Sequence, residues 1–249
     1  MSEPGDAEPL IAARSALLDA LEALAEHRDS LVLIGAQAVY LHTGDAAVAL
    51  AEATKDSDLA IDPRSLDDIP LLEEAMTRAG FTRDLLHPQP GSWLSPSGVP
   101  VDLMVPEALV QGSGRRSARI PPHSRHATRR TPGLEAAVVD HGPMTITALD
   151  PTDRRTAKIA VAGPAALLTS KLHKLGERQG DPGRLVDKDA HDVYRLLVAT
   201  ETAGLGARLI RLLRDPLAGP ATAVAIEHLR TLFAEPTGLG SVIGSLTLS

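Results

Sequence analysis

The chain has 249 residues, of which 43% are hydrophobic and 23% charged, and its formal net charge is −7. This is the composition of an ordinary globular protein, and the negative charge argues against broad electrostatic binding of nucleic acid. The absence of cysteine excludes disulfides, thiolate metal sites and cysteine nucleophiles, and the five aromatic residues disfavour base stacking on aromatic platforms.

The pattern of apolar residues predicts mixed helices and strands up to about residue 162 and helices after it. In chain order we expect a helix (10–27), a buried strand (31–34), a short helix (35–42), an alternating strand (54–62), a helix (66–79) and six further strands (81–86, 92–95, 99–105, 136–140, 144–149, 157–161). No apolar stretch approaches the roughly 18 residues that cross a membrane. The acidic N-terminus lacks a signal-peptide pattern. We therefore expect a cytoplasmic protein with no membrane partner.

The strand at 54–62 carries two acidic side chains on one face. Alternation places Asp56 and Asp58 on that face and Leu59 and Ile61 on the other. The Cα atoms of residues two apart on a strand lie roughly 6 to 7 Å apart, so both carboxylates can approach one hard divalent cation. Alone, an Asp-x-Asp pair is a weak signal, since such pairs also cap turns and line solvated strand edges.

A third carboxylate follows on the strand at 99–105. Its alternate residues are valine and leucine, and Asp102 points to the opposite face. If this strand neighbours the strand of Asp56 and Asp58, the three aspartates form a cluster that suits one or two Mg²⁺ ions, with Mn²⁺ as the alternative. Two-metal sites stabilise the attacking and leaving oxygens of phosphoryl and nucleotidyl transfer.

The turn between the strand at 31–34 and the next helix reads Gly35-Ala36-Gln37. Backbone N–H groups at a helix N-terminus can hold phosphate without any side chain. A tight strand-to-helix turn explains the glycine equally well.

A basic strip on this acidic chain is a candidate surface for an anionic acceptor. Six arginines and no acidic residue lie between residues 115 and 130. Arg115, Arg116 and Arg119 are the candidates for contacting an RNA acceptor. A solvated loop is the competing interpretation, because the same segment contains glycine and proline.

Two helices of the later part carry charges on their apolar faces. At about 100° per residue, Lys171 and Arg178 share the arc of Leu168 and Leu172. A lysine in such a place either extends its ammonium to water or meets an anion.

In the next predicted helix, Asp189 and Asp192 share the arc of Val193 and Leu196, so both acids face inward. Asp189 could simply cap the helix, whereas Asp192 lies a turn further in.

Five ordered motifs resemble the nucleotidyltransferase superfamily, and in particular its AbiEii-type branch, which includes toxins of type IV toxin–antitoxin systems and is related to the mycobacterial MenT toxins. They are Leu-Ile-Gly-Ala-Gln-Ala-Val (33–39), Thr-x-Asp-x-Asp-Leu (54–59), Val-Asp-Leu (101–103), Ser-Lys-Leu-His (170–173) and Lys-Asp-x-x-Asp-Val-Tyr-x-Leu (188–196). The second residue of the turn is Ala36, where the superfamily has serine or glycine, so the hydroxyl of a Gly-Ser turn is missing.

The resemblance implies an α/β fold, with a mixed β-sheet and flanking helices in residues 1–162 and a helical domain in residues 163–249 that contributes to the active site. It implies transfer of a nucleoside monophosphate from an NTP such as ATP to an acceptor hydroxyl, with release of pyrophosphate. The implied nucleotide-binding residues are Gly35, Ala36, Gln37, Thr54, Lys171, Arg178 and Asp189, the implied metal ligands are Asp56, Asp58 and Asp102, and the implied catalytic set adds Lys171 and Asp192 to those ligands.

The implied acceptor is the 3′ end of a tRNA or another RNA, and a cognate antitoxin is an implied partner. An antibiotic-type transferase that modifies a small hydroxylated molecule is a second interpretation. A non-catalytic binder with a degenerate site is a third, because the turn lacks the usual hydroxyl.

Overall fold

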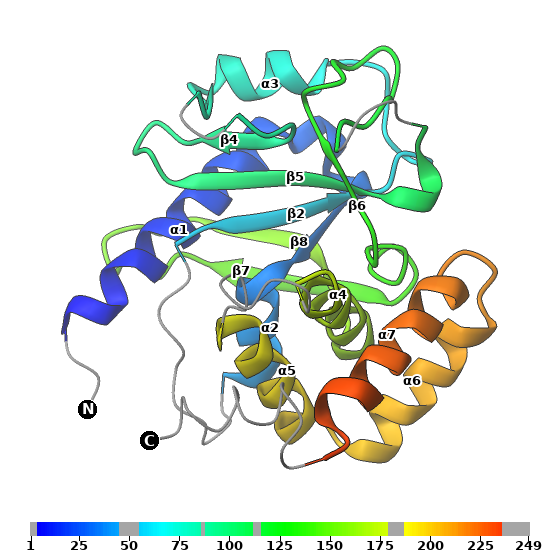
Figure 1. Cartoon of the computed structure of the whole chain (residues 1–249). Helices are drawn as coiled ribbons and strands as arrows, with labels where there is room; N and C mark the ends of the chain where they lie inside the picture. The colour runs from blue at the N-terminus through cyan, green and yellow to red at the C-terminus, as the bar shows by residue number, and fades with distance from the viewer. Residues whose placement is uncertain (1–3, 45–54, 86–87, 112–115, 179–186, 236–249) are drawn as a thin grey trace.

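The computed structural model describes residues 4–44, 55–85, 88–111, 116–178 and 187–235. Its centre is an eight-stranded mixed sheet in the order β3-β4-β5-β2-β1-β8-β7, with β6 paired to β5 (Figure 1). The strands are β1 (Leu31–Ile34), β2 (Ser57–Ile61), β3 (Thr82–Arg83), β4 (Ser92–Leu94), β5 (Pro100–Pro106), β6 (Arg129–Thr131), β7 (His141–Thr147) and β8 (Thr156–Ala162). The expected mixed sheet with flanking helices is confirmed.

The helices lie around this sheet and continue into the C-terminal part (Figure 1). They are α1 (Pro4–Ala23), α2 (Gly35–Thr43), α3 (Leu72–Arg78), α4 (Pro164–Gly176), α5 (Asp187–Ala199), α6 (Thr202–Arg214) and α7 (Gly219–Phe233), with short 3₁₀ turns η1 (Ala25–Ser30) and η2 (Glu107–Leu109). Buried residues of α4, α5, α6 and α7 belong to the same hydrophobic cluster as those of the strands. The boundary near residue 162 therefore divides element types within one continuous core.

None of the helices in the described part of the chain is long and apolar enough to span a membrane.

The pairing of the three central strands determines where the acidic residues lie. β1 and β2 are antiparallel, with Ile34 opposite Asp58, so the end of β1 and the start of β2 share one edge. β2 and β5 are parallel, with Asp58 opposite Asp102. Side chains of register partners point to the same face. The sheet therefore brings Asp58 and Asp102 side by side at the edge where α2 begins.

Helix α1 covers the opposite face of these strands. The Ser57 hydroxyl donates to the Ala13 carbonyl (2.8 Å), and Leu59 and Leu103 are fully buried. Strand alternation then directs Asp58 and Asp102 away from α1. The acids thus lie on the face of the sheet opposite to α1.

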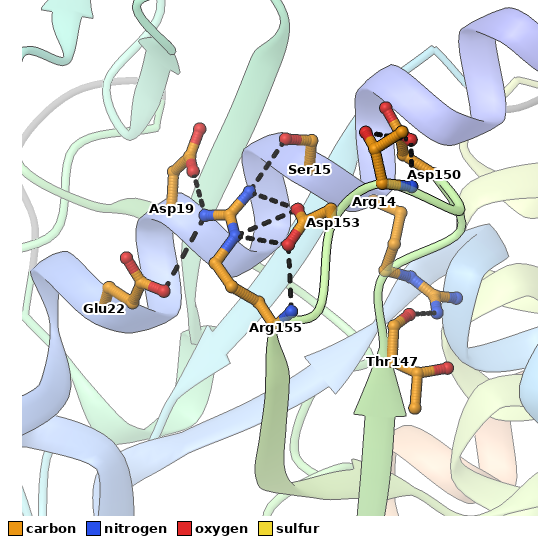
Figure 2. A network of polar contacts seen from close by, with 9 residues as sticks. Arg14, Ser15, Asp19, Glu22, Thr147, Asp150, Asp153 and Arg155 are labelled. Carbon is orange, nitrogen blue, oxygen red and sulfur yellow. Dashed lines mark hydrogen bonds and ion pairs between the residues drawn. The ribbon is translucent and has the colours of Figure 1, made fainter.

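Polar contacts fix α1 to the hairpin of β7 and β8 (Figure 2). Arg155 pairs with Asp19 and Asp153 and donates to Ser15. Further along, Arg14 donates to the Thr147 carbonyl (2.9 Å). This network lies on α1 and the hairpin, and it stabilises the packing of the helix that supports β2.

The structure corrects two predicted elements. Residues 136–140 were expected to form a strand, but they form turns, in which the Ala137 N–H donates to the Leu134 carbonyl and the Asp140 N–H to the Ala136 carbonyl. Residues 136–138 of the apolar run are buried, whereas Val139 is exposed. Local hydrogen bonds satisfy the backbone in place of the expected strand pairing.

The helix expected at 66–79 begins only at Leu72. Pro70 precedes it, and the residue before a proline is disfavoured in helical conformation. Strand β6 was not predicted at all, since three residues are too few to show a period.

Candidate active site

A cavity of about 1220 Å³ opens where the acidic edge of the sheet faces α4 and β6. Asp58 and Asp102 of the sheet and Asp56, which directly precedes β2, contribute to its wall. The other ionisable residues of the wall are Glu107, Arg116, His126, Arg129, Arg130, Lys171, Lys174, Glu177 and Arg178. Its apolar wall includes Ile34, Met104 and Leu134, together with prolines, and none of the described residues that line it is Phe, Tyr or Trp.

Gly35 allows Asp58 to sit against the start of α2. Its φ is +71°, a left-handed conformation that glycine adopts without strain. A Cβ at this position would lie 2.1 Å from Asp58 Oδ2, closer than two non-bonded atoms can approach. Glycine is therefore needed both for the turn and for the space that the carboxylate occupies.

The neighbouring turn residues face the interior. Ala36 and Gln37 are buried and do not line the cavity. Gln37 accepts from Arg14 Nε (2.8 Å) and donates to the Ser57 hydroxyl (2.6 Å). The Gln37 side chain thus links α1, α2 and β2, so nucleotide contact by Ala36 or Gln37 would have to use the backbone.

The electrostatics of the acidic wall are unfavourable for the charged form of Asp58. Burial and the neighbouring carboxylates of Asp56 and Asp102 raise the pKa of Asp58 to about 7, and Lys174 and Lys171 offset only part of that rise. A cation bound at this wall would relieve both causes. The donor set, oxygen atoms from three carboxylates, suits a hard divalent ion.

The carboxylates of Asp56, Asp58 and Asp102 do not converge on one point as the ligands of a metal ion do. Across residues 4–44, 55–85, 88–111, 116–178 and 187–235, no group of three Asp, Glu, His or Cys side chains is arranged to hold a metal ion. Asp102 is held by Arg129 (2.6 Å), and Asp56 lies 3.9 Å from Lys188. The residues fit a divalent ion by charge and donor type, and Arg129 contacts one of the two oxygens of Asp102.

Lys171 is buried, and the anions that it contacts are carboxylates of the protein. Its ammonium lies 2.6 Å from Asp192 and 2.9 Å from Asp189. Burial would lower the pKa of Lys171, but the charges and hydrogen bonds of the two aspartates outweigh it and hold that pKa above its ordinary value. Lys171 reaches the cavity wall, but its ammonium is already paired.

Asp189 and Asp192 face inward as the helical spacing predicted, and neither lines the cavity. Asp189 also pairs with Arg178 (2.9 Å) and with Lys174 (3.4 Å). Burial would raise the pKa of Asp189, but Lys171, with Lys174 and Arg178, outweighs it and holds that pKa well below its usual range. The structure thus gives both aspartates contact with Lys171, and no direct contact with the cavity.

Lys174 is the residue of this helix that sequence reasoning missed. It lies one turn after Lys171, lines the cavity, and its side chain is 49% exposed. The spacing of Lys171 and Lys174 on α4, with Arg178 just after its end, was the signal that could have identified it.

The arginine strip is divided by the fold. Arg116 lines the cavity, whereas Arg119 is exposed and does not. Arg129 and Arg130, which were not assigned a role from the sequence, also line the cavity. Thr54 and Arg115 lie outside the described residues.

Comparison with known proteins gives little further information. No protein family matches the sequence, and no curated protein matches it. One solved structure that matches is an antigenic nucleotidyltransferase-like protein from Paracoccidioides brasiliensis, with 16% sequence identity over 92% of this chain and 99% of that chain. The TM-score is 0.43. At this identity and TM-score, the likeness assigns neither a family nor an activity to this chain.

Proposed function

We propose that this protein transfers a nucleoside monophosphate from an NTP to an acceptor hydroxyl, as an AbiEii-type nucleotidyltransferase. The observation that carries the proposal is the register of the sheet, in which Asp58 and Asp102 lie opposite each other on parallel strands. Asp56 lines the same wall, and the cations of α4 lie across the cavity. Carboxylates facing cations across one cavity are the arrangement that a metal-bound triphosphate requires.

Asp56, Asp58 and Asp102 would hold Mg²⁺, or Mn²⁺ in its place. When bound, the ion supplies charge neutralisation at the transferring phosphate. The N-terminus of α2 at Gly35 offers backbone N–H groups to the phosphates. Asp102 pairs with Arg129, and both residues line the cavity with Arg116 and Arg130. We propose Asp102 as the residue that receives the proton of the acceptor hydroxyl.

The cavity wall favours an anionic acceptor. Arg116 and Arg130 line the side near β6, where a cationic aminoglycoside would be repelled and an RNA phosphate attracted. The volume of about 1220 Å³ exceeds the roughly 300 to 1,000 Å³ of small-ligand sites. It therefore has room for an NTP together with the end of a second substrate. We infer an RNA acceptor such as a tRNA 3′ end, with a toxin role as the biological setting.

A transfer assay tests the proposal directly. The full chain, incubated with each α-labelled NTP, Mg²⁺ and either total RNA or an aminoglycoside mixture, is expected to label RNA. The labelling should weaken as salt rises, because phosphate contacts by arginine release counterions. Label on the drug would support the small-molecule transferase. A folded protein that binds NTP but labels neither acceptor would support a non-catalytic binder. The Arg129 contact with Asp102 favours this alternative function.

We assign the phosphate contact on α4 to Lys174, whose side chain is 49% exposed, in place of the buried Lys171. Substituting Lys174→Met is expected to lower kcat/KM for the NTP about 10- to 100-fold, the effect of losing one charge-assisted hydrogen bond. The free energy of unfolding should change by less than about 0.5 kcal/mol, because the side chain is half exposed.

The control for this substitution is Lys158→Met, an exposed lysine on β8 that does not line the cavity. It should leave kcat/KM unchanged. Equal kinetics for Lys174→Met and the wild type would contradict the assignment.

A further inference from the structure

Arg129 makes a contact that the proposed reaction would have to break. Its guanidinium donates to Asp102 Oδ2 (2.6 Å), to Gln89 Oε1 (3.0 Å) and to Met104 Sδ (3.5 Å). The side chains of Arg129 and Asp102 are 14% and 18% exposed, and both line the cavity. The cation therefore occupies the wall position where a divalent ion would approach Asp102.

The backbone on both sides of Arg129 is fixed, so the side chain is the part that can move. Strand β6 pairs in parallel with β5, with Arg129 opposite Met104. The next residue donates from its N–H to the Arg116 carbonyl (2.8 Å). Gly91 packs so tightly against β6 that an added Cβ would lie 2.6 Å from the backbone nitrogen of Arg129. The Cα of Arg129 is thus held beside β5, within reach of Asp102 and of the cavity.

The contact with Asp102 is well suited to exchange. It uses one nitrogen of the guanidinium and one oxygen of the carboxylate, whereas the strongest arginine–carboxylate pairs are bidentate. A planar guanidinium binds a phosphate in the same way that it binds a carboxylate. Rotation of the side chain would therefore trade one oxyanion for another without leaving a charge unpaired.

We propose that Arg129 is an exchangeable counter-ion: it pairs with Asp102 before the substrates bind, and it moves to a phosphate oxygen of the NTP when a divalent cation takes its place at Asp102. This inference rests on the proposed function. It adds a positioning and phosphate-binding residue to the site. No covalent bond changes in this step.

The alternative is a fixed ion pair in which Arg129 only orients Asp102. The two descriptions predict opposite effects on metal binding. If Arg129 competes with the metal ion, its removal frees Asp102 and Mn²⁺ binds more tightly. If Arg129 orients Asp102, its removal leaves the carboxylate misplaced and Mn²⁺ binds more weakly.

The experiment measures Mn²⁺ binding to the full chain without nucleotide, by calorimetry or by the electron paramagnetic resonance signal of free Mn²⁺. Arg129→Gln is expected to bind Mn²⁺ about tenfold more tightly than the wild type, and to lose about 10- to 100-fold in kcat/KM for transfer. The matched control is Arg130→Gln, which removes a neighbouring cavity cation that pairs with Glu107 (3.2 Å). This control reports the long-range effect of losing one positive charge. The Mn²⁺ affinity of Arg130→Gln should differ from that of the wild type by less than about threefold.

A double-mutant cycle makes the test specific to the pair. On an Asp102→Asn background, Arg129→Gln should no longer tighten Mn²⁺ binding, because the contested carboxylate is gone. Arg129→Met, which removes the charge but keeps a long side chain, replaces Arg129→Gln with the same expectation if that variant does not fold.

Unchanged or weaker Mn²⁺ binding by the folded Arg129 variants would overturn the exchange. If the wild type still transferred nucleotide in that case, the proposed function would stand without it. If neither the wild type nor the variants bound Mn²⁺ and no transfer occurred, the exchange and the proposed function would both fail.

Discussion

Replacing Asp58 with asparagine is expected to abolish nucleotidyl transfer and, at the same time, to stabilise the metal-free protein. The loss of activity should reach about a thousandfold or more, because Asp58 faces Asp102 at the centre of the proposed metal site and asparagine cannot supply the second negative charge. The gain in stability has a separate cause, which is the cost of keeping the Asp58 carboxylate charged where it lies.

Burial and the carboxylates of Asp56 and Asp102 raise the pKa of Asp58 from 3.8 to about 7. The folded protein thus binds a proton that the unfolded chain has released, so stability falls as pH rises from about 4 to about 7. Asparagine carries no charge and removes this fall. In a chelator at pH 8, Asp58→Asn should raise the free energy of unfolding by about 2 to 4 kcal/mol, and near pH 4 the two proteins should be equally stable.

Chemical denaturation at several pH values, with and without Mg²⁺, measures the effect. Bound Mg²⁺ stabilises only the wild type, so the advantage of the variant should shrink as Mg²⁺ is added. Asp62→Asn is the matched control, an aspartate just beyond β2 that pairs with Arg64 on the surface and does not line the cavity. It should leave transfer intact. Retained activity in a folded Asp58→Asn protein would remove the metal assignment.

The sequence predicted the orientation of the acidic residues better than their surroundings. Strand alternation and one apolar face were enough to indicate that Asp58 and Asp102 point away from the core, and the sheet confirms that they lie on neighbouring strands. These features are local to each strand. The contact of Asp102 with Arg129 depends on the pairing of β6 with β5, which a strand of three residues does not reveal.

The same distinction explains the result for Lys171. Helical periodicity placed it correctly on the apolar face with Leu168 and Leu172, and all three are buried. Periodicity indicates that such a lysine needs an anion, but the identity of the anion depends on how two helices pack. The packing of α4 against α5 supplies Asp189 and Asp192 as the anions for Lys171. The proposed phosphate contact on α4 is therefore that of Lys174.

Lys171→Met is accordingly expected to destabilise the fold by about 3 to 5 kcal/mol, the cost of leaving a buried charge without its partner. Asp189 would keep Arg178 and Lys174, but Asp192 would lose the ammonium at 2.6 Å, and its side chain is fully buried. Lys174→Met, three residues along the same helix, should cost less than about 0.5 kcal/mol. Denaturant unfolding of the two variants in a chelator makes the comparison.

The double variant Lys171→Met/Asp192→Asn separates a lost ion pair from a lost packing contact. Neutralising Asp192 removes the uncompensated charge, and replacing both members of a buried pair costs far less than removing one. The double variant should therefore recover at least about half of the stability that Lys171→Met loses. If Lys171→Met instead folded with wild-type stability and lost only kcat, Lys171 would act on the substrate directly, and the assignment of the phosphate contact to Lys174 would be wrong. Recovery in the double variant would show that Lys171 stabilises the fold by neutralising the buried charge of Asp192, and that α5 packs against α4 without the ion pair.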